Sequence, residues 1–304
     1  MKTIMSNGNM IELDSRFSTT RRVFESNQSA GIRQKSDAIK SRVIPVQSNT
    51  CRNGGLRSRG YFKGSELTKP LISVITVVYN GREYIERAIN SVLEQTYDNV
   101  EYLIIDGGST DGTLDIIEKY DEVVDYWVSE PDHGVYDAMN KGIELFHGDY
   151  VLFLGCDDIL YDVLQEVVGY FNSSSTSYYG NVILSENQRV YGGRFFPLKL
   201  FIQNIPHQAI FYSKQVFSEY SFDCKYITVA DYALNLKLFS NKKYGLKYIP
   251  KTIANYNNER GLSSTLIDHQ FSKDKPGIIQ KHYSVFYYWF YMMLRFVFKK
   301  NKVK

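Results

Sequence analysis

The segment ISVITVV, residues 72–78, contains only apolar and small hydroxyl side chains, and β-branched residues dominate it. A strand of this composition has no polar face to turn toward water, so both of its faces must be covered. Strands buried in this way belong to parallel sheets with helices packed on each side. This run therefore predicts a mostly parallel α/β sheet.

Helix and strand patterns alternate after this run. Apolar residues Ile85, Ile89, Val92 and Leu93 recur at helical spacing, and a second strand, VEYLIID, follows. A helix through Tyr120, a strand near VDYWVSE, a helix over YDAMNKGIELF and a fourth strand, YVLFLG, complete the series. The order predicts a doubly wound sheet with right-handed crossovers and helices on both faces.

Polar residues, most of them acids, follow the four strands. Ligands of doubly wound sheets bind outside the carboxyl ends of the strands, so these side chains mark the expected site. The first strand is followed by neither a Walker loop nor a GxGxxG loop, so phosphate would have to be held in another way. The residues are Tyr79 and Asn80, then Asp106, then Glu130 and Asp132, and finally Asp157 and Asp158.

Asp157 and Asp158 stand side by side, and like charges this close need a cation or water around them. A hard cation such as Mg²⁺ or Mn²⁺ takes one or two carboxylates and completes its shell with substrate phosphates. The pair therefore indicates a metal ion that carries a nucleotide diphosphate. The alternative is a solvated cap of a helix that begins at Ile159.

Charge is unevenly distributed along the 304 residues. Residues 1–69 hold 13 Lys and Arg against 5 Asp and Glu, the last ten residues hold 5 against none, and residues 70–294 hold 18 against 28. The acidic middle disfavours nucleic acid as the main ligand, because phosphate backbones require clustered Lys and Arg. Three cysteines without a CxxC pair, and no signal-peptide pattern, favour a reducing cytosol.

Both ends of the chain differ from this core. Residues 1–69 are rich in Ser, Asn, Gly and Arg, which predicts a mostly disordered basic leader. Residues 283–304 are aromatic and apolar before terminal lysines, but the apolar run is shorter than the ~20 residues of a spanning helix. We expect a C-terminal aromatic helix at the membrane interface, and a helix packed on the core is the alternative.

Four ordered motifs resemble the family 2 glycosyltransferases of GT-A fold. They are SVITVVYNGREYIERAINSVLEQTY, LIIDGGSTDGT, SEPDHGVYDAMNKGI and GDYVLFLGCDD, and the resemblance covers roughly residues 70–265. The chain is similar to enzymes of bacterial exopolysaccharide and lipopolysaccharide assembly. The resemblance implies an inverting transfer of one sugar from a nucleotide sugar, usually a UDP-sugar, to an acceptor hydroxyl with the help of Mn²⁺ or Mg²⁺.

The resemblance also assigns the nucleoside end of the site. It implies that Asp106 grips the nucleobase, as a carboxylate there can accept the uracil N3–H. Asp also suits the turn at this position, which is the alternative interpretation. Tyr79 and Asn80 match the lining of the nucleoside pocket. Gly107 departs from the family, which often has a second Asp there.

The metal and sugar contacts follow from the next two motifs. The resemblance implies that Asp158 is the direct metal ligand and that Asp157 orients the ribose or a metal-bound water. Asn140 and Lys141 match the segment that closes on the donor, where they would contact the sugar or the diphosphate. An exposed polar helix face is the alternative for these two residues.

The second half of the chain must supply the acceptor site and the base. Asp231, near the start of a predicted helix, matches the acid that faces the acceptor, and an inverting displacement needs one such base. Asp223 is the alternative base. His207 and Gln208 would line the active site, although a lone histidine is equally compatible with the core.

These observations give a predicted organisation. Residues 1–69 form the leader, residues 70–282 the GT-A domain (70–160 the nucleotide-sugar half, 161–282 the acceptor half) and residues 283–304 the membrane-associating tail. The expected acceptor is a saccharide or a lipid-linked saccharide, and the expected location is the cytoplasmic face of the inner membrane. A sugar-nucleotide nucleotidyltransferase and a non-catalytic sugar-binding protein are the alternative classes.

Overall fold

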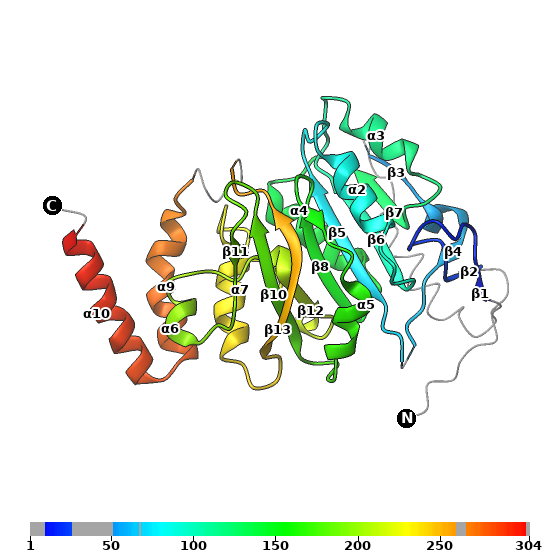
Figure 1. Ribbon diagram of the computed structural model, residues 1–304. Helices are drawn as coiled ribbons and strands as arrows, with labels where there is room; N and C mark the ends of the chain where they lie inside the picture. The colour runs from blue at the N-terminus through cyan, green and yellow to red at the C-terminus, as the bar shows by residue number, and fades with distance from the viewer. Residues whose placement is uncertain (1–9, 26–50, 67, 260–265, 302–304) are drawn as a thin grey trace.

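A ten-stranded sheet forms the centre of the molecule in the computed structural model, which describes residues 10–25, 51–66, 68–259 and 266–301 (Figure 1). One of the ten strands, the short β11 (Val190–Tyr191), pairs only with β10 and lies off the main order. Across the sheet the other strands are β3 (Arg52–Gly54), β7 (Tyr126–Ser129), β6 (Val100–Asp106), β5 (Ile72–Val78), β8 (Tyr150–Gly155), β12 (Ile210–Ser213), β10 (Ser177–Leu184), β13 (Leu246–Tyr256) and β9 (Ile159–Leu160).

The four strands predicted from the sequence lie together and parallel. β5 pairs with β6 on one side and with β8 on the other, and β6 pairs with β7. Beyond β8 the sheet continues through the antiparallel strand β12. The predicted α/β fold, with a parallel core in a mixed sheet, is therefore confirmed, and the carboxyl ends of β5 to β8 lie along one edge.

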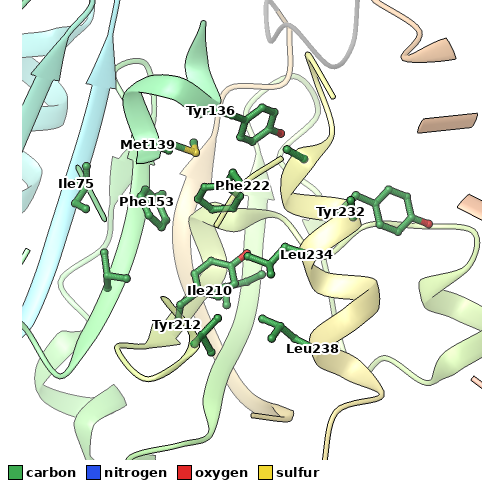
Figure 2. Close-up of a cluster of buried hydrophobic side chains, with 14 of the residues drawn as sticks. Ile75, Tyr136, Met139, Phe153, Ile210, Tyr212, Phe222, Tyr232, Leu234 and Leu238 are labelled. Carbon is green, nitrogen blue, oxygen red and sulfur yellow. The ribbon is translucent and has the colours of Figure 1, made fainter. Parts of the chain in front are cut away.

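Helices cover both faces of the sheet, because alternate residues of β5 point to opposite sides. Val74 and Val78 pack in one core with α2 (Ile85–Leu93), α3 (Thr113–Lys119) and α5 (Leu164–Val167). Ile75 and Val77 pack in the other core with α4 (Val135–Leu145) and α7 (Ala230–Phe239). Figure 2 shows Ile75 on the same side as Met139 of α4, with Phe153 and Phe222 between α4 and α7.

Two long helices lie at the end of the molecule opposite the N-terminal strands (Figure 1). α9 (His269–His282) packs on α7, and α10 (Val285–Asn301) packs on α9 and on the short helix α6 (Pro197–Leu200). The Phe201 ring lies 4.8 to 6.1 Å from the rings of Tyr283, Tyr287 and Tyr291. One side of α10 is therefore part of the core.

The other side of α10 carries exposed apolar side chains at helical spacing. They are Phe286, Trp289, Met293 and Phe296. The C-terminal aromatic helix is thus present, and it combines a packed side with an uncovered one. No helix in the described part of the chain is both long and apolar enough to cross a bilayer.

The leader is folded where the structure describes it, so the prediction of disorder is wrong for residues 10–25, 51–66 and 68–69. β1 (Met10–Ile11), β2 (Val23–Glu25) and β4 (Tyr61–Phe62) form a small antiparallel sheet, and β3 adds an antiparallel edge to β7. A 3₁₀ turn, η2 (Leu56–Arg59), lies between β3 and β4. The rest of that prediction, for residues 1–9, 26–50 and 67, lies outside the described residues.

Hydrogen bonds to the end of α2 hold this segment in place. The Ser18 backbone N–H donates to the Leu93 carbonyl and the Ser18 hydroxyl donates to the Val92 carbonyl, each at 2.8 Å. The Arg21 guanidinium donates to the Gln95 carbonyl at 3.1 Å. Carbonyls at the end of a helix have no partner within it, so the leader supplies their missing donors.

A buried ion pair joins the leader to the sheet at the edge opposite the polar strand ends. The Arg57 guanidinium contacts the Glu101 carboxylate and donates to the Leu145 carbonyl at 2.7 Å. Glu101 is fully buried and also accepts the backbone N–H of His147 at 2.8 Å. The Arg57 charge, ahead of the His147 contacts, holds the pKa of Glu101 well below its usual range despite the opposing effect of burial.

Candidate active site

The end of β6 is built around a buried carboxylate. Asp106 accepts the Ser109 backbone N–H at 3.0 Å and the Ser129 hydroxyl at 2.6 Å. Asn80 adopts a left-handed conformation (φ 52°) after β5, and its side chain accepts the Thr110 N–H at 2.9 Å. These bonds fold the loop after β6 against the end of β5.

Tyr79 and Asn80 are exposed beside this loop, and the Tyr79 side chain is 64% exposed. The structure thus brings Tyr79, Asn80 and Asp106 to one edge, where a nucleoside would meet an exposed ring next to fixed polar groups. Asp106 itself is fully buried, and its carboxylate is occupied by its two serine partners. Its contact with a nucleobase stays a prediction.

Gly107 leaves room for a carboxylate from another strand end. A Cβ at Gly107 would collide with the Asp132 side chain, so Asp132 fills the space of the side chain that Gly107 lacks. One Asp132 oxygen accepts the Gly134 N–H at 2.8 Å. A carboxylate therefore lies beside Asp106 at this edge, and only the position of Asp132 at a strand end hinted at it in the sequence.

The adjacent carboxylates after β8 have different environments. Asp158 is buried, and its two oxygens accept the backbone N–H groups of Gly155 at 3.0 Å and Asn257 at 2.8 Å. Asp157 is partly exposed and lines a polar cavity of 240 Å³ with Arg87. The residues after the pair form strand β9, so no helix begins at Ile159 for Asp157 to cap.

Both carboxyls of the pair have an increased affinity for protons. Burial raises the pKa of Asp158 to about 6, the Asp157 charge adds to the rise, and the Asn257 N–H, Gln208 and His207 oppose it. Burial also raises the pKa of Asp157, against the opposing effects of its own backbone N–H and of His207. A cation beside the pair would relieve this cost of ionisation.

Asp231 is the centre of a buried hydrogen-bond network at the start of α7. Its carboxylate accepts the Tyr136 hydroxyl at 2.8 Å and the Asn204 amide at 2.8 Å. The His207 Nδ1 lies 3.3 Å from the same carboxylate. Tyr136 and Asn204 escaped the sequence analysis, because nothing in their local pattern sets them apart from structural residues.

His207 and Gln208 lie between Asp231 and the Asp157–Asp158 pair, in the 3₁₀ turn η4 (His207–Ala209). His207 contacts Asp231, and its charge favours ionisation of both members of the pair. The Gln208 side chain hydrogen-bonds Asp158. The structure thus brings these predicted residues together around one polar centre.

Asn140 and Lys141 of α4 hold loops in place. Asn140 makes two hydrogen bonds to the Phe222 backbone, donating to its carbonyl at 2.8 Å and accepting its N–H at 3.0 Å. The Lys141 ammonium contacts Glu130 at 2.8 Å and the Pro131 carbonyl at 2.9 Å. Their side chains have structural partners, and contact with a donor sugar stays a prediction.

Asp223, the alternative base, has a different environment from Asp231. Its carboxylate is 39% exposed and lies 3.2 Å from the Lys225 ammonium. It lines a larger cavity, of 480 Å³, between α7 and α9. Of the two acids, Asp231 contacts His207, which lies beside the Asp157–Asp158 pair. Asp223 lines a separate groove.

The donor set is compatible with a hard divalent cation that takes most of its ligands from elsewhere. No group of three or more His, Cys, Asp and Glu side chains in the described ranges is arranged to hold a metal. Mg²⁺ and Mn²⁺ are commonly held by one or two carboxylates, with substrate phosphates and water as the other ligands. Asp157 fits this role, because among the described residues its carboxylate accepts a hydrogen bond only from its own backbone N–H.

The fold and the site together define a class of protein. Polar residues lie together at the carboxyl ends of the parallel strands β5 to β8, and His207 contacts a buried carboxylate on α7. This is the arrangement of a GT-A glycosyltransferase.

Comparison with known proteins agrees. The model of glycosyl transferase family 2 matches residues 73–219. A PGL/p-HBAD biosynthesis glycosyltransferase of Mycobacterium bovis is 35% identical over 221 residues, which cover 69% of this chain and 86% of the relative. A putative teichuronic acid biosynthesis glycosyltransferase of Bacillus subtilis, TuaG, is 46% identical over 93 residues, or 30% of this chain and 37% of TuaG. The chain belongs to glycosyl transferase family 2 and is a glycosyltransferase.

Solved structures share the fold. Residues 1–349 of Staphylococcus aureus TarS in complex with UDP-GlcNAc superpose with a TM-score of 0.55 at 19% identity, over 68% of this chain and 65% of that one. The mannosyltransferase PcManGT of Pyrobaculum calidifontis, in complex with GDP-Man and Mn²⁺, gives a TM-score of 0.50 at 15% identity, over 82% and 70%. The chain thus spans less than two thirds of the TarS fragment.

Proposed function

We propose that this enzyme transfers one sugar from a nucleotide sugar, a UDP-sugar in the first instance, to an acceptor hydroxyl with inversion at the anomeric carbon. The acceptor we propose is a lipid-linked saccharide of bacterial cell-surface polysaccharide assembly. The names of the two relatives, one a PGL/p-HBAD biosynthesis glycosyltransferase and the other a putative teichuronic acid biosynthesis glycosyltransferase, support a role in polysaccharide or glycoconjugate assembly. The UDP-GlcNAc bound to TarS supports the choice of UDP.

The observation that carries this proposal is the environment of Asp231. A direct displacement needs a single base that takes the proton from the acceptor hydroxyl. Asp231 is buried, and Tyr136 and Asn204 fix its orientation while His207 links it to the carboxylate pair. In the proposed reaction Asp231 accepts the proton, and its two neutral donors keep the carboxylate aligned.

The carboxylate pair would bind the donor diphosphate together with Mn²⁺ or Mg²⁺. The family resemblance implies that Asp158 is the metal ligand, but its oxygens already accept two backbone N–H groups. We therefore propose Asp157 as the residue that holds the ion and Asp158 as the residue that holds its loop. When bound, such an ion stabilises the negative charge of the departing diphosphate.

Membrane association is a further part of the proposal. Phe286 and Trp289 of α10 are 72% and 64% exposed on the side that faces away from the core. Four lysines follow within the last six residues of the chain. Aromatic side chains next to basic residues suit the interface of an anionic bilayer. We place the enzyme peripherally on the cytoplasmic face of the inner membrane.

A donor screen tests the proposal. UDP- and GDP-sugars are supplied with Mn²⁺, Mg²⁺ or EDTA, and release of the nucleoside diphosphate is measured with and without an extract of lipid-linked saccharides. We expect metal-dependent release from a UDP-sugar and faster release with the acceptor. Release at the same rate in the presence of EDTA would exclude the metal role. A product that retains the anomeric configuration of the donor would exclude inversion.

A further inference from the structure

A second cavity of the described structure lies away from the strand ends. It is a groove of 480 Å³ between α7 and α9, two helices that run side by side in Figure 1. Its volume is in the range of small-ligand sites. Its charged lining consists of four lysines and two aspartates, namely Lys225, Lys237, Lys273, Lys281, Asp223 and Asp274.

The two aspartates of the groove share one of its lysines, and the lining as a whole has two more lysines than aspartates. The Lys225 ammonium lies 3.2 Å from Asp223 and 3.3 Å from Asp274. Asp274 also accepts the hydroxyl of Tyr226 at 3.0 Å. The other three lysines of the lining have no anionic partner among the residues that the structure describes. The groove therefore carries uncompensated positive charge.

Lys237 of α7 is half-buried, so its ammonium charge is partly removed from water. Burial lowers the pKa of Lys237, and the charges of Lys225 and Lys281 lower it further against the opposing effect of Asp223. Burial and the charges of Lys281 and Lys237 likewise lower the pKa of His282 at the end of the groove. A half-buried ammonium without a counter-ion is unfavourable unless an anion reaches it.

We propose that this groove binds a phosphate-bearing anion between α7 and α9, with Lys237 and Lys281 as its principal contacts. Ammonium groups bind phosphate as point charges, and two of them from facing helices can hold one phosphodiester or diphosphate. The groove is open above Gly277, where a Cβ would meet no atom within 4 Å. The source of the phosphate is either a lipid headgroup or a soluble phosphate compound.

The wall of this groove is close to the active site. The loop that contributes Asp223 and Lys225 begins at Phe222, whose backbone is held by Asn140 of α4. α7, which contributes Lys237, begins with the segment that contains Asp231. The groove is nevertheless a separate site, and its binding does not depend on the proposed donor or acceptor.

Variants of the groove give a direct test on the full-length protein. Lys237→Gln with Lys281→Gln removes two charges, and Gly277→Glu places a carboxylate among the remaining lysines. Gly277→Ala is the control for helix propensity, and Lys119→Gln with Lys247→Gln removes two exposed charges outside the groove. Inorganic pyrophosphate is titrated by calorimetry, and vesicles of phosphatidylcholine with or without phosphatidylglycerol are tested by sedimentation.

We expect pyrophosphate to bind the wild type, and binding to weaken about tenfold or more in both groove variants and in neither control. Phosphatidylglycerol-dependent vesicle binding that is lost in the groove variants and displaced by pyrophosphate would assign a lipid headgroup. Pyrophosphate binding with vesicle binding unchanged in those variants would assign a soluble phosphate compound.

Two results would overturn the proposal. One is pyrophosphate binding that is equal in the wild type and both groove variants. The other is pyrophosphate binding that only Asp157→Asn removes, because the anion then occupies the donor site. A wild-type protein that binds pyrophosphate in the groove but does not bind UDP would contradict the proposed glycosyl transfer from UDP-sugars and leave the groove proposal unaffected.

Discussion

The Tyr136 hydroxyl donates a hydrogen bond of 2.8 Å to the Asp231 carboxylate, and through it α4, which connects β7 to β8, is joined to α7. The same hydroxyl lies 3.0 Å from the Thr228 carbonyl. The proximity of Asp231 and burial hold the pKa of Tyr136 well above its usual value, with burial the larger cause. Tyr136 thus remains a neutral donor that fixes the carboxylate.

Asp231→Asn is expected to lower sugar transfer by ~10²- to 10⁴-fold, because the amide retains the size of the side chain but cannot accept a proton. UDP affinity should change little. Transfer rates and UDP titrations on the same preparation measure both effects. Asp223→Asn is the matched control, and it should transfer at nearly the wild-type rate because Asp223 lies in the groove between α7 and α9.

Equal losses of UDP affinity and transfer in Asp231→Asn would place Asp231 in the donor pocket instead. Loss of transfer in Asp223→Asn with activity kept in Asp231→Asn would reverse the assignment of the base.

The parallel core could be predicted from the sequence because its information is local. The unbroken apolar run of β5 and the helical spacing of Ile85 and Ile89 are visible within a few residues of one another. The network of Asp231 could not be predicted, because Tyr136 and Asn204 lie 95 and 27 residues away in the chain. Only the folded chain brings them to one carboxylate.

The roles of Asp157 and Asp158 show the same limit. Both residues lie in the turn after β8, and the sequence does not say which of the two carboxylates becomes buried. The Asn257 N–H, 99 residues away, decides this by hydrogen-bonding Asp158. The leader was mispredicted for a related reason, since strands of two or three residues carry no periodicity.

The substitutions Asp157→Asn and Asp158→Asn should therefore have different effects. Asp158→Asn turns an amide N–H₂ toward a backbone N–H, so we expect a loss of about 1–3 kcal/mol in the free energy of unfolding. Asp157→Asn should unfold like the wild type and lose Mn²⁺-dependent UDP binding. Denaturant unfolding and UDP titration with and without Mn²⁺ separate the two. Full metal-dependent binding in Asp157→Asn would return the metal to Asp158.

Arg57→Met tests whether the leader stabilises the catalytic domain. It leaves the buried Glu101 without its guanidinium partner, so the free energy of unfolding should fall by about 3–5 kcal/mol. Arg57→Met combined with Glu101→Gln should recover part of the loss, because the uncompensated charge is then absent. Urea unfolding of the three proteins measures this coupling, and an unchanged midpoint in Arg57→Met would contradict it.

Lys275 gives a prediction about pH. Burial, with a smaller effect of Arg295, lowers the pKa of Lys275 to about 7, and its ammonium donates to the Tyr232 hydroxyl at 2.8 Å. Between pH 7 and the ordinary lysine pKa, the unfolded chain binds more protons at this residue than the folded one. Its contribution to stability therefore rises with pH across this window and is lost as pH falls toward 7.

Lys275→Met removes this titration, and the Tyr232 hydroxyl keeps its bond to the Leu200 carbonyl. We expect the variant to be more stable than the wild type by ~1 kcal/mol near pH 7, because the Tyr232 and Phe271 rings offset part of the burial cost of the ammonium. The difference should shrink toward pH 10. Thermal unfolding from pH 7 to 10 measures it, and a difference that stays constant with pH would show that Lys275 is not the titrating group.

Phe286→Glu combined with Trp289→Glu tests the uncovered side of α10. A truncation of residues 283–304 would also expose Phe201, which packs among Tyr283, Tyr287 and Tyr291. Such a truncation could not separate a loss of membrane binding from a loss of core packing. The two substituted side chains are exposed, and the variant should unfold like the wild type while its sedimentation with phosphatidylglycerol vesicles falls about tenfold or more.

Val190→Glu, at an exposed apolar residue of β11, is the control. Because the other tryptophan, Trp127, is buried, vesicles should shift the fluorescence of Trp289 to the blue in the control and in the wild type. Wild-type sedimentation of the double variant would show that α10 does not meet the bilayer.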